Sequence, residues 1–312
     1  MTKKTHFIRW VALLVFLLPL LVGAGAYFFY PQSFLSLVRM RYEWNAGASA
    51  KVVEVDGYKI PYYEGGNAKG PVFVLIHGFG DSKISFLQAA KWLVSEYRVI
   101  LPEVPGFGET QRDPKRNYSI RSQVKMFDKF FNKLGLKRFH IGGNSMGGHI
   151  SAAYALAHPK KVLSLHLLNA AGLKTRAKIP YKPAKKPIKT GKDFDEFMSK
   201  IFYKKPHVPR PFKSYFIARA AKNFHWNNRI TKDIREGKDY ILNKRIHKLT
   251  MPTQVIWGDT DKLVHISIGK RYHTSIKGSR WVLMKKCGHS PQYERPEETA
   301  GLLRRFLLSL KK

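Results

Sequence analysis

The sequence predicts an α/β fold in which a mainly parallel central sheet is flanked by helices. Two observations lead to this prediction. Short apolar runs alternate with helix-like stretches, which is typical of parallel strands joined by helical crossovers. The run Pro71–Ile76 has no polar interruption, as expected of a strand covered on both faces. Polar residues that follow such strands should gather at one edge of the sheet.

The elements are expected in a regular order. An alternating stretch at 52–60, with an Asp-Gly pair at its centre, predicts a hairpin. Further strands are expected at 71–76, 97–101, 139–142, 162–168, 254–257 and 281–284, and helices at 86–94, 120–134, 150–158 and 297–310.

The composition indicates a large globular protein with a basic surface. The 312 residues exceed the usual domain size of about 100 to 200, but sheet-based α/β domains commonly run longer. Hydrophobic residues make up 44%, so the net charge of +35 does not indicate disorder. Such a charge attracts anionic lipid, acidic substrates or nucleic acid, and does not choose among them. The single cysteine, Cys287, excludes an internal disulfide, and no cysteine and histidine spacing suggests a structural metal.

The amino terminus carries an uncharged, apolar run at Trp10–Tyr30 that follows several basic residues. As a helix, its 21 residues would span about 31 Å, close to a hydrocarbon core of roughly 30 Å. We expect residues 1–30 to form a single transmembrane signal anchor, with the amino terminus in the cytoplasm and the folded domain on the far side of the membrane. The alternative is a signal peptide, with export after cleavage near Ala26. Residues 31–50 would form a juxtamembrane linker.

The segment 173–250 interrupts the alternation of strands and helices. It contains six prolines and 22 Lys or Arg residues against six Asp or Glu residues, and no clear strand. We expect it to be a basic helical cap, or lid, inserted into a core made of residues 51–172 and 251–312. Its charge would dock it on an anionic membrane, where each basic residue contributes about 1 kcal/mol, or steer an anionic substrate. The alternative is a solvated face.

The stretch Gly143-Asn144-Ser145-Met146-Gly147 is the strongest motif in the chain. It lies between an expected strand and an expected helix, where a serine would sit on a tight turn that demands small neighbours. This is the pattern of a nucleophile elbow, in which the hydroxyl projects above the sheet edge. A glycine-rich turn that only packs is the alternative.

A serine hydroxyl becomes a strong nucleophile only when a histidine takes its proton and a carboxylate fixes the histidine tautomer. Both partners are expected downstream, at strand ends. Asp261 follows the strand at 254–257 and is the expected acid, with Asp259 as the fallback. His289 follows the strand at 281–284 and is the expected base.

A second glycine-rich loop, His77-Gly78-Phe79-Gly80, follows the strand at 71–76. Its turn would let the backbone amide of Phe79 join that of Met146 as two donors to a tetrahedral oxyanion. One such donor lowers the barrier by roughly 3 kcal/mol. The ring of His77 is expected to brace the loop and to transfer no proton.

Together with Pro105-Gly106-Phe107-Gly108, these motifs resemble the α/β-hydrolase fold family from Val52 to the carboxyl end. The resemblance implies the α/β-hydrolase fold and a Ser-Asp-His triad. The apolar amino terminus and the motif G-N-S-M-G-G resemble membrane-anchored monoacylglycerol lipases and similar bacterial lipases. Glu103 stands where relatives usually carry Asp. Ser145 argues against the dehalogenase and epoxide-hydrolase branches, which use an aspartate nucleophile.

We therefore expect a membrane-associated serine hydrolase that cleaves acylglycerols or other lipid esters through an acyl-enzyme. Ser145 would attack, His289 would act as base and Asp261 would orient it. No metal, no organic cofactor and no nucleic-acid partner is expected. Hydrolases that cleave carbon–carbon bonds of ring-fission products share the motif and are the first alternative. The second is a non-catalytic, polyanion-binding membrane protein on the same scaffold.

Overall fold

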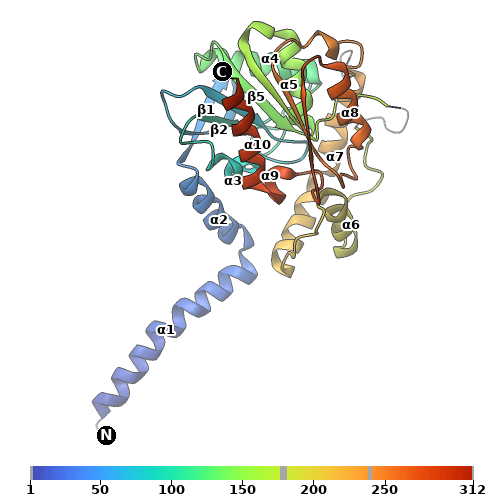
Figure 1. Ribbon diagram of the computed structural model, residues 1–312. Coiled ribbons are helices and arrows are strands. Elements are labelled where there is room, and N and C mark those ends of the chain that lie inside the picture. Colours follow the sequence, from blue (N-terminus) through green and yellow to red (C-terminus); the bar gives the residue numbers. More distant parts are fainter. Residues whose placement is uncertain (1–2, 176–180, 238–240, 311–312) are drawn as a thin grey trace.

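The computed structural model describes residues 3–175, 181–237 and 241–310 of the protein (Figure 1). The strands in these residues are β1 (Ala48–Val55), β2 (Tyr58–Gly66), β3 (Val72–Ile76), β4 (Arg98–Pro102), β5 (Phe139–Asn144), β6 (Val162–Leu168), β7 (Thr253–Gly258) and β8 (Arg280–Met284). They form one sheet in the order β1-β2-β4-β3-β5-β6-β7-β8. β1 and β4 pair antiparallel with β2, and all other pairs are parallel. The predicted mainly parallel sheet is confirmed.

The hairpin at the start of the sheet closes at the predicted Asp-Gly pair. Asp56 and Gly57 have φ angles of 50° and 71°, and Val55 pairs with Tyr58. Two central residues in the left-handed region are what a two-residue hairpin turn requires. The local sequence therefore fixes the register of the antiparallel edge.

The helices of the described residues are α1 (Lys3–Phe29), α2 (Pro31–Asn45), α3 (Leu87–Ala90), α4 (Ile120–Lys133), α5 (Met146–Ala157), α6 (Gly191–Ile201), α7 (Arg210–Glu236), α8 (Ile266–Ser275), α9 (Pro291–Glu294) and α10 (Pro296–Ser309). Helices cover both faces of the sheet. Apolar side chains of α4, α5 and α8 join one core, and those of α3 and α10 join another. Along β3, Val74 and Ile76 enter the first core while Phe73 and Leu75 enter the second, which explains the uninterrupted apolar run.

Four helices differ from the expectation. The helix expected at 86–94 is shortened to α3, because residues 91–96 form turns. α8, which follows β7, and the short α9 were not predicted. Residues 31–45 form α2 instead of a linker, and α2 contacts the body of the protein: the guanidinium of Arg39 lies 3.0 Å from the carboxylate of Glu109.

The predicted transmembrane anchor is wrong, and so is the membrane-spanning location that was based on it. Among the residues that the structure describes, no helix combines the length and the apolar character needed to cross a bilayer. α1 spans 27 residues and contains Pro19. Figure 1 shows α1 extending away from the sheet.

Helices α6 and α7 lie between β6 and β7 in the chain, and the described residues of 173–250 include no strand. Residues 176–180 and 238–240 of the predicted cap lie outside the described part. α7 is seated on the loop that follows β4, because the indole nitrogen of Trp226 donates to the carbonyl of Gly106 at 2.7 Å. The carboxylate of Asp233 also accepts from the Tyr118 amide at 2.9 Å. The boundaries of the cap stay a prediction.

Candidate active site

Ser145 lies between the end of β5 and the first residue of α5, in a backbone conformation that few side chains adopt. Its φ is 55° and its ψ is −115°. Neighbouring chain segments hold this conformation: the Ser145 amide donates to Leu168 at 3.0 Å, and its carbonyl accepts from Ala171 at 2.9 Å. A strained residue held by its surroundings is typical of functional sites.

The two glycines that flank this turn leave no room for a side chain. A Cβ added to Gly147 would lie 2.0 Å from the carbonyl oxygen of Ile76 on β3. A Cβ added to Gly143 would lie 2.5 Å from the same oxygen. The turn can therefore approach β3 this closely only with glycine on both sides of Ser145, as the motif predicts.

His289 and Asp261 meet on neighbouring loops after β8 and β7. The Nδ1 of His289 lies 2.8 Å from Oδ2 of Asp261, whose carboxylate is fully buried. That carboxylate also accepts hydrogen bonds from the Asn169 side chain at 2.7 Å and from the amides of Leu263 and Val264 at 2.8 and 2.9 Å. This carboxylate thus has three donors besides the histidine. Because a carboxylate accepts hydrogen bonds, its contact with Nδ1 of His289 assigns a proton to Nδ1 and leaves Nε2 to accept one.

Asp259, the alternative acid, contacts the loop that leads to His289. Its carboxylate accepts from the amide of Cys287 at 3.3 Å. Asp259 therefore supports the loop that precedes His289, and the geometry selects Asp261 as its partner.

Asn144 joins the serine turn to the histidine loop. Its side-chain amide donates to the carbonyl of His289 at 2.8 Å and to that of Leu168 at 3.2 Å. Asn144 and Asn169 belong to this candidate site by their contacts and were not singled out from the sequence. Both carried a usable signal, since Asn144 is part of the glycine-rich motif and Asn169 directly follows β6.

The loop after β3 lies against the serine turn. A Cβ added to Gly78 would lie 3.3 Å from Cβ of Ser145, so the backbone next to Phe79 runs beside the candidate nucleophile. Met146 is the first residue of α5 and is buried. The ring of His77 contacts the Gly78 carbonyl and Glu103 at 2.8 and 2.9 Å, as expected of a residue that braces the loop.

Glu294 links the histidine loop to the segment after α6. One carboxylate oxygen accepts from the Gly288 amide at 2.9 Å, and the other accepts from the Tyr203 amide at 2.7 Å. The amide of His289 also donates to Ile201 at 2.6 Å. Burial raises the pKa of Glu294 above its ordinary value, and the nearby charge of Asp261 adds to this. The position of α6 and that of His289 are therefore connected.

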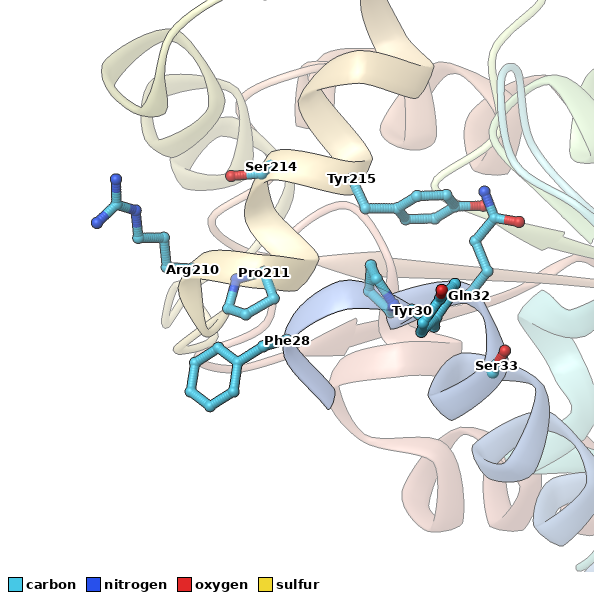
Figure 2. A pocket seen from close by; sticks show the side chains of 9 residues that line it. Phe28, Tyr30, Gln32, Ser33, Arg210, Pro211, Ser214 and Tyr215 are labelled. Atoms are coloured by element: carbon cyan, nitrogen blue, oxygen red, sulfur yellow. The ribbon is translucent and has the colours of Figure 1, made fainter. Parts of the chain in front are cut away.

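A pocket of about 890 Å³ lies away from these residues, between the α1–α2 junction and the start of α7 (Figure 2). Its lining residues are Phe28, Tyr30, Pro31, Gln32, Ser33, Arg210, Pro211, Ser214 and Tyr215. Among the described residues, no group of three His, Cys, Asp or Glu side chains is placed to hold a metal ion.

Comparisons with known proteins agree with this geometry. The family model described as "alpha/beta hydrolase fold" matches residues 71–230. Lipase 1 of Psychrobacter immobilis is 32% identical over 259 residues, which cover 80% of this chain and 81% of the lipase. Monoacylglycerol lipase ABHD6 of Bos taurus is 29% identical over 315 residues, covering 94% of this chain and 92% of that protein.

The crystal structure of a membrane phospholipase A has a TM-score of 0.83 and 34% sequence identity, covering 97% of this chain and 99% of that one. The resemblance seen in the motifs is therefore confirmed. The relatives are lipases, and their fold is the one observed here. This chain belongs to the α/β-hydrolase fold family and is a hydrolase similar to ester-cleaving lipases.

Proposed function

We propose that this protein is a serine hydrolase that cleaves carboxylic esters of lipids. The proposal depends on how Ser145 is held relative to His289. Ser145 has a strained backbone and lies between glycines. The adjacent Asn144 donates to the carbonyl of His289, whose ring contacts Asp261. The lipid class of the substrate is supported by the names of the relatives, which are a lipase, a monoacylglycerol lipase and a membrane phospholipase A.

In the proposed reaction, the Ser145 hydroxyl attacks the ester carbonyl while Nε2 of His289 takes its proton. Asp261 stabilises the imidazolium through Nδ1. The carbonyl oxygen becomes an oxyanion that accepts from the backbone amides of Phe79 and Met146, each of which lowers the barrier by roughly 3 kcal/mol.

The tetrahedral intermediate collapses when the ester C–O bond breaks, and His289 gives its proton to the departing alcohol. Ser145 is then acylated. Water attacks the acyl-enzyme after losing a proton to His289, and breakdown of the second intermediate releases the fatty acid and restores the serine. In both halves of the reaction, His289 takes a proton from the attacking oxygen and gives it to the leaving oxygen, so Ser145 regains its hydroxyl proton from His289.

Exposed aromatic and basic residues of the predicted cap support an association with lipid headgroups. Phe197 and Tyr203 are 42% and 49% exposed, and the exposed Lys204 and Arg210 follow them in the chain. Exposed aromatic side chains beside basic ones are typical of surfaces that bind anionic lipid, where each basic residue contributes about 1 kcal/mol. Sedimentation with anionic and with neutral vesicles tests this association. Equal binding to both would contradict it.

The activity itself is tested with two substrates and one label. We expect hydrolysis of a monoacylglycerol and no cleavage of a ring-fission dienoate. A fluorophosphonate should label the wild-type protein but not Ser145→Ala. Turnover of the dienoate alone would favour the carbon–carbon hydrolase. Absence of labelling together with salt-dependent polyanion binding would favour a non-catalytic protein. A series of p-nitrophenyl esters would then define the acyl-chain length.

A further inference from the structure

A row of alternating charges runs from helix α2 to the loop that carries Phe79. Its members, in order, are Arg39, Glu109, Lys83, Glu103 and His77, which we call the charge row. Nitrogen–oxygen distances between successive members are 3.0, 2.6, 3.5 and 2.9 Å. The side chains of the last three are 2%, 0% and 0% exposed, so this end of the charge row is closed to water.

Glu103 is the centre of the charge row. Besides its contacts with His77 and Lys83, its carboxylate accepts from the backbone amides of Lys83 at 2.9 Å and Glu109 at 3.2 Å. Burial raises the pKa of Glu103, but the hydrogen bond from His77 and the charges of His77 and Lys83 outweigh it, so the pKa lies below its ordinary value. A buried carboxylate with this many donors holds three chain segments in fixed relative positions.

The ring of His77 is held at both of its nitrogens. Nδ1 lies 2.8 Å from the Gly78 carbonyl and Nε2 lies 2.9 Å from Glu103, and both oxygens only accept hydrogen bonds. The Val104 amide donates to Nε2 at 2.9 Å, so this nitrogen has a donor as well as an acceptor beside it. Burial lowers the pKa of His77, but the hydrogen bond and charge of Glu103 raise it more, to above the ordinary value. Glu103 thus fixes the ring that holds the Gly78 carbonyl, one residue before Phe79.

The carboxylate of Glu103 fills the space that a side chain at position 108 would occupy. A Cβ at Gly108 would lie 2.1 Å from the carboxyl carbon of Glu103. Gly108 also has a φ of 55°, which glycine adopts without strain. The long side chain therefore reaches His77 on one side and Lys83 on the other.

At its other end, the charge row begins on α2. Arg39 lies 3.4 Å from Glu43, one turn further along α2, and Glu43 accepts a short hydrogen bond from the hydroxyl of Tyr63. The ammonium of Lys83 lies 5.1 Å from the ring centre of Tyr63. Two routes therefore connect α2 to Lys83, one through Glu109 and one through Tyr63.

We propose that Lys83 and Glu103 are positioning residues for the Phe79 amide, and that the charge row makes this amide sensitive to how α2 is seated. The inference rests on the proposed function, because it assigns Phe79 a role in stabilising the oxyanion. When one member of a buried ion pair loses its charge, the oppositely charged partner is left buried and unpaired. Relaxation of that neighbour moves the loop, and a misplacement of about 1 Å in an active site can lower the rate by about 100-fold.

The first experiment compares two glutamates. With a soluble p-nitrophenyl ester, Glu103→Gln should lower kcat by about 10-fold to 100-fold with KM within about twofold of the wild type. Glu103→Asp keeps the charge and should recover most of that loss. Glu64→Gln is the matched control, because Glu64 also pairs with two cations, Lys51 and Arg98, at 2.9 and 2.6 Å, on the antiparallel edge of the sheet. It should lower thermal stability and leave kcat unchanged.

The second experiment tests the connection to α2. Arg39→Gln should lower kcat by about 3-fold to 10-fold, whereas Arg41→Gln, on the same helix, should not change it. If Glu103→Gln does not fold, Glu109→Gln replaces it, since Glu109 is 51% exposed and lies between Arg39 and Lys83.

Equal kcat in Glu103→Gln, Glu64→Gln and the wild type would overturn the positioning role. Equal kcat in Arg39→Gln and Arg41→Gln would overturn the coupling to α2. Both comparisons are interpreted only when the wild-type protein hydrolyses the ester and reacts with fluorophosphonate. A wild type that neither reacts nor hydrolyses esters would instead refute the proposed function.

Discussion

The side chain of Asn144 donates a hydrogen bond of 2.8 Å to the backbone carbonyl of His289. These residues are far apart in the sequence, and their contact brings the end of β5 to the loop after β8. Ser145 follows Asn144 directly, so one hydrogen bond sets the candidate nucleophile against the loop of the candidate base. Variants of Asn144, Asp261 and Gly147 test how Ser145 and His289 are held in place.

Replacing Asn144 by alanine should lower kcat for ester hydrolysis by about 10-fold and reduce stability by about 1 to 3 kcal/mol, because the buried carbonyl of His289 loses this donor and that of Leu168 keeps the Ser145 amide but loses its second donor. Steady-state kinetics and thermal unfolding measure the two effects. Asn132→Ala is the control, since Asn132 is exposed and bonds to Asp128 on α4 and to Lys161 just before β6. An Asn144→Ala variant with unchanged kcat would show that the contact does not position His289.

The choice between the two aspartates is directly testable. Asp261→Asn should lower kcat by about 10⁴-fold, because an amide in place of the carboxylate favours the wrong tautomer of His289. Asp259→Asn should reduce kcat less than about 10-fold, since the carboxylate of Asp259 accepts from the backbone amide of Cys287, whereas that of Asp261 contacts the ring of His289. Comparable losses in both variants would contradict the assignment.

The close approach of the serine turn to β3 predicts a large effect of a single methyl group. Gly147→Ala would place Cβ 2.0 Å from the Ile76 carbonyl, so the variant should unfold at a much lower temperature or fail to accumulate. Gly301→Ala in α10 meets only the end of the Arg305 side chain at 3.2 Å and should be stabilising by up to about 1 kcal/mol. Thermal unfolding of purified proteins compares them. A Gly147→Ala variant as stable as the wild type would be incompatible with this turn.

Stability should depend on pH through Glu103 and His77. The pKa of His77 is raised above 6.5, so its contribution is complete below pH 6.5 and is lost as pH rises through the folded-state value. The pKa of Glu103 is lowered below 4.5, so its contribution is complete above pH 4.5 and is lost as pH falls through the folded-state value. The difference in unfolding free energy between the wild type and Glu103→Gln should therefore be largest between pH 4.5 and 6.5. Denaturant titrations across the pH range measure it, and a difference that is constant with pH would exclude an ionised pair.

Much of the fold could be predicted because the signals are local. Apolar runs identify the parallel strands, the Asp56-Gly57 pair identifies the hairpin, and the glycines around Ser145 identify the turn. The transmembrane anchor predicted from the amino-terminal run was wrong, since no described helix meets the length and apolar character of a membrane span. α2 could not be foreseen, since polar contacts with Glu109 and Tyr63 seat it on the body.

By itself, the sequence determined which side chains are available for chemistry and at which strand ends they lie, because strands and tight turns follow from residues close together in the chain. Only the tertiary structure decided between Asp261 and Asp259, which are two residues apart and carry the same group. It also placed Asn144 against His289 and aligned the charge row from Arg39 to His77. Hydrogen bonds and ion pairs depend on distances of a few ångström between segments far apart in the chain, and only the folded backbone sets those distances.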